Sequence, residues 1–147
     1  MLQIHKVKKV KTPERSGRNA GFDFFVPDDF KSTILTSGES ISIPSGIKVR
    51  LPENHVLIAF NKSRLAAHYG LQVGACVVDE NYVGEIHLDI HNISKSVFVV
   101  ESRMKLMQFV LVKQEYHDVM EITSLDELYA NFDTEERGGG GFGSTGI

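Results

Sequence analysis

Short strand-like segments, some alternating between apolar and polar residues and others continuously apolar, are separated by turn-forming residues along this 147-residue chain. In residues 86–91, Ile86, Leu88 and Ile90 alternate with two histidines and an aspartate. Residues 41–43 and 47–51 also alternate, with Pro-Ser-Gly between them, whereas residues 56–60, 97–100 and 106–112 are short apolar runs. A period of two is typical of half-buried strands, so the series predicts an all-β sandwich or barrel-like domain.

Two short segments have a helical pattern instead. Residues 63–69 follow a predicted strand, and we expect a short helix there, capped by Ser63. Ser124 and Glu127 have the capping-box spacing that opens a helix near Tyr129. These helices are too short to change the all-β prediction.

The C-terminal segment becomes polar and then rich in glycine, so we expect a packed domain over residues 1–132 and a separate segment over 133–147. Composition alone favours a disordered tail. However, Arg137 offers a bidentate fork for phosphate, and Phe142 offers a flat face for a base. Glycines let the backbone fold over a ligand, so the segment is also a candidate lid.

Composition excludes several classes of protein. The net charge of −3 argues against a broad nucleic-acid-binding surface but allows a small cationic pocket. The single cysteine, Cys76, excludes an internal disulfide and a cysteine zinc cluster. No apolar run is long enough to span a bilayer, and no secretory segment is evident. We therefore expect a soluble cytoplasmic protein with neither membrane nor nucleic acid as a partner.

Residues 74–85 place a polar Asp-Glu-Asn-Tyr turn between two apolar stretches, which predicts a β-hairpin. Asp79 and Tyr82 at its tip can hold a sugar or a base, although an aspartate in a turn more often serves the turn itself. Lys62, Ser63 and Arg64 follow a strand and open a helix, which suits a phosphate. The alternative for these three residues is a helix cap with two solvated charges.

Further polar residues lie within the predicted strands. Asp23 and Gln108 lie within such runs, so each needs a partner, either structural or functional. The His-x-Asp-x-His pattern at residues 87–91 suggests a metal site, but same-face residues about 7 Å apart along a strand converge poorly on one ion. We interpret this trio as the polar face of a sheet or as part of a subunit interface.

Taken together and in order, several of these segments resemble the motifs of the trimeric deoxyuridine triphosphatases (dUTPases). The matching segments are residues 20–23, 62–66, 74–85, 105–109 and 137–146. The resemblance implies a jelly-roll β-clip fold and a homotrimer with active sites shared between subunits. One chain supplies the first, second and fourth motifs, a second supplies the hairpin, and a third supplies the lid. The reaction is hydrolysis of dUTP to dUMP and pyrophosphate with Mg²⁺, which limits uracil in DNA and supplies dUMP for dTMP synthesis.

The resemblance also implies roles for single residues. Asp79 is the general base that orients water against the α-phosphorus, and Gln108 lies near the α-phosphate. Tyr82 leaves no room for a ribose 2′-OH. The hairpin backbone around Cys76, Val77 and His87 reads the uracil edge.

The remaining implied roles concern the phosphates and the metal. Lys62, Ser63 and Arg64 bind the phosphate chain, and Asp23 helps to place the water shell of the Mg²⁺. Phe142 stacks on the uracil. The other implied contacts of the lid come from Arg137, Gly143, Ser144 and Thr145.

Several positions depart from the family pattern. Lys62 and Lys105 replace arginines, which exchanges a bidentate fork for a point charge. Arg64 and Cys76 stand where glycine is common, and Asn81 stands where a second aspartate is common. We expect these changes to affect affinity and nucleotide selectivity rather than the type of reaction.

Three alternatives remain open at this point. The first is a dCTP deaminase, or a bifunctional deaminase–dUTPase of the same fold, in which Glu85 shuttles a proton. The second is a nucleotide-sensing regulatory protein that keeps the fold and binds a protein partner. The third is a β-sandwich with a functionless tail.

Overall fold

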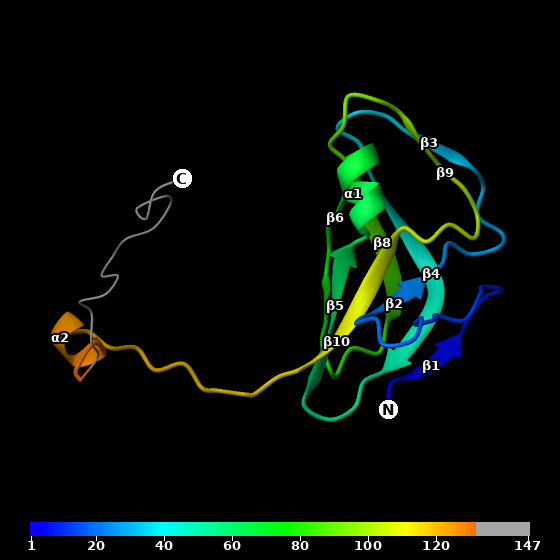
Figure 1. Cartoon of the computed structure of the whole chain (residues 1–147). Coiled ribbons are helices and arrows are strands. Elements are labelled where there is room, and N and C mark those ends of the chain that lie inside the picture. The colour runs from blue at the N-terminus through cyan, green and yellow to red at the C-terminus, as the bar shows by residue number, and fades with distance from the viewer. Residues whose placement is uncertain (132–147) are drawn as a thin grey trace. The chain divides into compact units, whose positions relative to one another are not determined.

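Two antiparallel four-stranded sheets and a two-stranded ribbon form the first of two units in the computed structural model, which describes residues 1–131. The strand orders are β1-β4-β8-β6, β2-β10-β5-β7 and β3-β9, and Figure 1 shows β10 between β2 and β5. The strands are β1 (Gln3–Lys6), β2 (Gly21–Phe24), β3 (Thr33–Leu35), β4 (Ser40–Arg50), β5 (His55–Asn61), β6 (Leu71–Val73), β7 (Val77–Val78), β8 (Glu85–Asn92), β9 (Phe98–Val100) and β10 (Met107–Lys113). The all-β prediction is therefore confirmed.

One cluster of buried side chains forms the core of this unit. Phe24 of β2 and Phe109 of β10 pack with ring centroids 4.5 Å apart, and both are almost fully buried. The predicted alternation in β8 is also confirmed, because Ile86, Leu88 and Ile90 are buried while the two histidines of the strand are exposed. This apolar face fixes the register, since a slip of one residue would expose it.

The predicted turn between residues 41–43 and 47–51 is wrong. These residues form one strand, β4, whose pairing with β8 is irregular between Pro44 and Lys48. Gly46 has a φ of 77°, and its N–H donates a hydrogen bond of 2.6 Å to the Glu85 carboxylate. The Pro-Ser-Gly sequence thus makes a bulge, where glycine tolerates the left-handed conformation, and the strand continues beyond it.

The predicted hairpin over residues 74–85 has different arms from those expected. β7 pairs with β5, whereas β8 pairs with β4 and β6. The antiparallel arms are β6 and β8, and the Gly74 N–H continues their pairing by donating to the Asp89 carbonyl at 3.0 Å. The tight turn itself is present, since the Tyr82 N–H donates to the Asp79 carbonyl at 3.1 Å.

The first predicted helix is confirmed as α1 (Ser63–Tyr69), but the predicted cap is wrong. Lys62 is the N-cap, and no side chain caps the helix; the Lys62 carbonyl accepts the Ala66 N–H at 2.9 Å. The helix ends at Gly70, where φ is 63°. A Cβ there would lie 2.8 Å from that of Ser94, so both conformation and space require glycine.

The second unit begins at His117, so the contacts divide the chain earlier than the expected end of the packed domain at residue 132. It contains α2 (Leu125–Leu128), where the Ser124 hydroxyl accepts the Glu127 N–H at 3.4 Å, as the capping-box pattern predicts. The candidate lid, residues 133–147, lies outside the described residues. Among residues 1–131, no helix has the length and apolar character needed to cross a membrane.

Candidate active site

Asp23 and Gln108 lie opposite each other on the outer face of the second sheet. They are register partners on β2 and β10, so both point away from the core that Phe24 and Phe109 fill. The Gln108 amide donates to the Asn61 carbonyl at 3.1 Å. A Cβ on Gly21 would lie 2.4 Å from the Gln108 amide oxygen, which explains the glycine two residues before Asp23.

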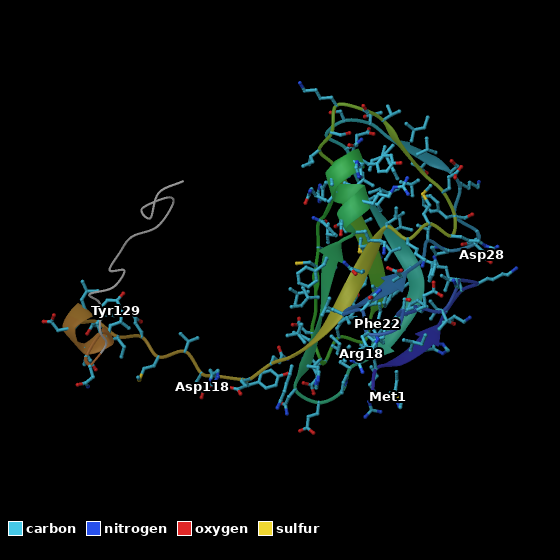
Figure 2. All side chains as sticks on the ribbon, viewed as in Figure 1. Met1, Arg18, Phe22, Asp28, Asp118 and Tyr129 are labelled. Carbon is cyan, nitrogen blue, oxygen red and sulfur yellow. The ribbon has the colours of Figure 1, made fainter. Side chains whose placement is uncertain are left out.

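Two lysines complete this group, which we call the strand cluster (Asp23, Lys62, Lys105 and Gln108). Lys62 is paired with one carboxylate oxygen of Asp23, and the Lys105 ammonium lies 3.0 Å from the other. The partner that Asp23 requires is therefore a pair of lysines. Phe22, the neighbour of Asp23 labelled in Figure 2, lies 5.4 Å from the guanidinium of Arg15, which adds positive charge beside the same strand.

The electrostatics of the strand cluster keep its carboxylate ionised. Burial raises the pKa of Asp23, but hydrogen bonds from Lys62 and Lys105 outweigh burial and hold the pKa below its usual range. Lys105 also lies 2.8 Å from Glu14, and hydrogen bonds from Lys105 and then Lys11 lower the pKa of Glu14 to about 2. The cluster therefore presents two charged ammonium groups held in place by carboxylates.

Ser63 and Arg64 follow Lys62 directly and are exposed at the start of α1. Arg64 and Lys105 line a hollow of about 320 Å³ together with the rings of Tyr69 and Phe98. Motifs far apart in the sequence thus meet at one surface, as the resemblance implies for the first, second and fourth motifs.

The residues predicted to bind the nucleoside gather around a second hollow, which we call the loop cavity. Its volume is about 350 Å³. It is lined by Ser42, Ala75, Cys76, Val77, Val78, Asp79, Tyr82, Glu85, Ile86, His87 and Phe109. Asp79 is exposed here, and the His87 ring lies 3.0 Å from the Glu85 carbonyl.

The ring of Tyr82 lies against Gly84 in the backbone of the loop. Its hydroxyl donates to the Glu85 carbonyl at 3.0 Å, and the side chain is 42% exposed. A Cβ on Gly84 would lie 2.3 Å from the ring carbon that bears the hydroxyl, so only glycine permits this position of the ring. The result is a fixed aromatic wall three residues after Asp79.

Cys76 occupies its position in the loop without backbone strain. In residues 1–131 the non-glycine residues with positive φ are Asn54, Arg103 and Asn131. The Cys76 carbonyl accepts the Ala59 N–H at 2.7 Å, and its side chain packs against the core. The cysteine that stands here in place of the family's usual glycine therefore leaves the loop backbone in an ordinary conformation.

The strand cluster and the loop cavity are separate within one chain. No hydrogen bond or ion pair connects the two groups in the part of the chain that the structure describes. Gln108 and Phe109 are neighbours on β10 and point to opposite faces of the sheet; only Phe109 lines the loop cavity.

The described residues form no dedicated metal site. No group of three or more histidines, cysteines or carboxylates able to hold an ion occurs within residues 1–131. Asp89 and His91, 3.7 Å apart, pack beside Gly74 instead, where a Cβ would lie 2.5 Å from the His91 ring.

Sequence reasoning missed three residues that contact these groups. Glu14 pairs with Lys105, which lies 91 residues further along the chain. Glu80 accepts a hydrogen bond from Tyr116 at 2.7 Å. No local pattern links residues so far apart, so only the fold reveals these contacts.

Comparisons with known proteins identify the family of this chain. Residues 8–146 match the dUTPase family. The deoxyuridine 5′-triphosphate nucleotidohydrolase of Rickettsia bellii (strain OSU 85-389) is 36% identical, with 97% of this chain and 95% of that protein covered. The enzyme of the same name from Mus musculus is 32% identical over 89% of this chain and 75% of its own length.

Solved structures show the same fold. A mutant dUTPase of Staphylococcus bacteriophage 80alpha with dUpNHpp matches with a TM-score of 0.84 at 20% identity, covering 100% of this chain and 99% of that one. The native dUTPase of EIAV matches with a TM-score of 0.70 at 25% identity, covering 83% and 96%. The chain belongs to the dUTPase family, as its motifs predict, and has the jelly-roll-like fold of that family.

Proposed function

We propose that this protein hydrolyses dUTP to dUMP and pyrophosphate. Membership of the dUTPase family supports the reaction. The observation that carries the assignment is the loop cavity, where Asp79 and the fixed Tyr82 ring lie on one tight turn. The relatives reported above carry the hydrolase name and none carries a deaminase name, so the deaminase and regulatory alternatives gain no support.

In the proposed mechanism, Asp79 accepts a proton from a water molecule as that water attacks the α-phosphorus. A bond forms between the water oxygen and the α-phosphorus. The bond from the α-phosphorus to the bridging oxygen breaks, and pyrophosphate leaves with that oxygen. Gln108 contacts the α-phosphate from the strand cluster, where its amide is already oriented by the Asn61 carbonyl.

The loop cavity supplies selectivity for the nucleoside. The Tyr82 ring lies against the deoxyribose and leaves no room for a 2′-OH, which rejects UTP. The backbone around Cys76, Val77 and His87 reads the uracil edge and rejects cytosine, because each mismatched buried polar group costs about 1–3 kcal/mol. A tight loop also rejects the 5-methyl group of dTTP.

The strand cluster and the C-terminal segment would hold the triphosphate. Lys62 and Arg64 supply positive charge, and the Ser63 hydroxyl contacts the bridge near the scissile bond. The lid residues Arg137, Phe142, Gly143, Ser144 and Thr145 are proposed on sequence alone, with Phe142 stacking on the uracil. Phe142→Ala should therefore weaken nucleotide binding while the stability of the assembly stays unchanged.

We expect Mg²⁺ to enter this site bound to the phosphates of the substrate. Because the ion keeps several waters and binds substrate phosphates, it needs few protein ligands, and the described residues offer no cluster that would hold it alone. Asp23 would contact the water shell from the strand cluster. When bound, the ion neutralises charge on the phosphates.

We further propose that the active site is shared between subunits of a homotrimer. The strand cluster and the loop cavity open on different faces of one chain, so a substrate that touches both requires two chains. We place this activity in the cytoplasm, where it would limit uracil in DNA and supply dUMP.

Pyrophosphate release from dUTP, dCTP, dTTP and UTP in the presence of Mg²⁺ tests the proposal. Turnover of dUTP alone is the expected result. Comparable turnover of dCTP would contradict the proposed reading of the base. If none of the four nucleotides released pyrophosphate, the hydrolase assignment would be wrong, and ammonia release from dCTP would be measured next.

A further inference from the structure

The outer side of the Asp79 turn carries a hydrogen-bond network that the reaction scheme above does not use. One carboxylate oxygen of Glu80 accepts the Tyr116 hydroxyl at 2.7 Å and the Asn54 N–H at 2.9 Å. Glu80 directly follows Asp79, so these two hydrogen bonds restrain the residue next to the proposed base. The inner side of the same turn is held separately by the Tyr82 N–H bond to the Asp79 carbonyl.

Gln114 orients the tyrosine and ties the network to the sheet. Its side-chain amide donates to the Tyr116 hydroxyl at 2.7 Å, and its backbone N–H donates to the Asn54 carbonyl at 2.9 Å. Asn54 lies in the connection between β4 and β5, and Gln114 directly follows β10. Three segments far apart in the sequence therefore meet at the Glu80 carboxylate.

The charges around the tyrosine keep it a donor. The hydrogen bond to Glu80 raises the pKa of Tyr116, with smaller contributions from desolvation and from the charges of Glu80 and Asp79, and these outweigh the hydrogen bond from Gln114, which lowers it. Tyr116 thus stays protonated through neutral and mildly alkaline pH. Its side chain is 65% exposed, so the ring contributes little to the core and the hydroxyl is its main contact.

We propose that Tyr116 is a positioning residue that acts through Glu80 to hold the Asp79 turn in its reactive geometry. This inference rests on the proposed function. A proposed base displaced by a fraction of an ångström loses alignment with the attacking water, while the contacts that bind nucleotide remain. Tyr116 therefore affects the chemical step more than substrate affinity.

The test uses the full-length chain with Tyr116→Phe, Glu80→Ala, the double variant and Glu80→Gln. Thr33→Val is the control, because it removes an exposed hydroxyl that donates to the Lys31 carbonyl, outside this network and outside the candidate site. We expect Tyr116→Phe to lower kcat for dUTP about threefold to tenfold, while KM and affinity for the imido analogue of dUTP change less than about twofold. The double variant should be no slower than Glu80→Ala, and Glu80→Gln should retain most of kcat because it keeps an acceptor.

Hydrogen exchange of the Tyr82 amide gives a readout independent of turnover. We expect Tyr116→Phe to speed this exchange and Thr33→Val to leave it unchanged. Normal kcat together with normal Tyr82 exchange in Tyr116→Phe would overturn the inference, as would additive losses in the double variant. Absence of dUTP hydrolysis by the unmodified chain would instead overturn the proposed function, and the exchange measurement would still decide the role of Tyr116.

Discussion

The strand cluster and the loop cavity are built in different ways. In the strand cluster, two lysines that precede α1 and β10 meet Asp23 of β2, because strand register places Asp23 opposite Gln108 of β10. In the loop cavity, backbone bonds and glycine contacts set the shape, as at Gly84 beneath the Tyr82 ring. We therefore expect the first region to bind the phosphates of the substrate by charge and the second to select the nucleoside by shape.

This difference predicts distinct responses to perturbation. Charge pairs on a partly exposed surface weaken with salt and with acid. A backbone-defined cavity is insensitive to salt, but a single added methyl group changes it. Variants in the two regions should therefore separate phosphate binding from nucleoside selectivity.

The largest expected effect comes from the loop cavity. Asp79→Asn removes the proposed base and keeps the shape of the side chain, so turnover of dUTP should fall by about 10²–10⁴-fold. Circular dichroism and affinity for the imido analogue should remain unchanged. Asp118→Asn, an exposed substitution in the second unit, is the control. Near-normal turnover in Asp79→Asn would mean that another group is the base.

Gly84→Ala should have the next largest effect. The added Cβ would lie 2.2 Å from the Tyr82 hydroxyl, so the ring must rotate away from the loop. We expect kcat/KM for dUTP to fall about 10²-fold and the preference for dUTP over UTP to shrink. Gly38→Ala adds a methyl group in open space at a φ of 81°, so it should lower stability but leave selectivity intact, which separates backbone strain from displacement of the ring. Unchanged discrimination in Gly84→Ala would show that Tyr82 does not exclude the 2′-OH.

A smaller effect is expected in the strand cluster. Lys62→Met removes one cation beside Asp23, so KM for dUTP should rise about tenfold at low salt and the difference should narrow at high salt. Selectivity among the four nucleotides should stay the same. Lys31→Met at an exposed site is the control. Altered base selectivity in Lys62→Met would contradict the proposal that the strand cluster binds the phosphates and the loop cavity alone selects the nucleoside.

Acid titration should give the smallest effect. The pKa values of Glu14, Asp23 and Asp28 are lowered in the folded chain, so ionisation of these groups favours folding. Their contribution is complete above the ordinary carboxylate pKa and is lost as pH falls from about 5 towards 2. Urea unfolding at a series of pH values should show this loss, and Glu14→Gln should flatten it. If the free energy of unfolding falls equally with pH in Glu14→Gln and in the unmodified chain, Glu14 contributes nothing to the acid response.

Local patterns in the sequence predicted most of the fold. Alternation identified β8, short apolar runs identified β5 and β10, and the Ser124 cap identified α2. The turn expected at residues 44–46 was wrong because a glycine at positive φ also suits a bulge within a longer strand. The cap of α1 was wrong by one residue, because Ser63 and Lys62 were not distinguishable without the backbone geometry.

The site was predictable only where its residues are close in sequence. The Asp79–Tyr82 turn is local, and the structure groups it with Cys76, Val77 and His87 as expected. The pairing of Asp23 with two lysines depends on strand order. Contacts such as Tyr116 with Glu80 likewise join segments that no pattern connects.

Complementation between two inactive variants tests the central claim most directly, that the two regions act together across subunits. Asp79→Asn and Gln108→Ala would be expressed alone and together, and pyrophosphate release from dUTP would be measured. If the site is shared, random mixing in equal amounts should restore about a quarter of the unmodified activity, because each intact site needs one region from each variant. Activity no greater than that of the separate variants would show that both regions act within one chain.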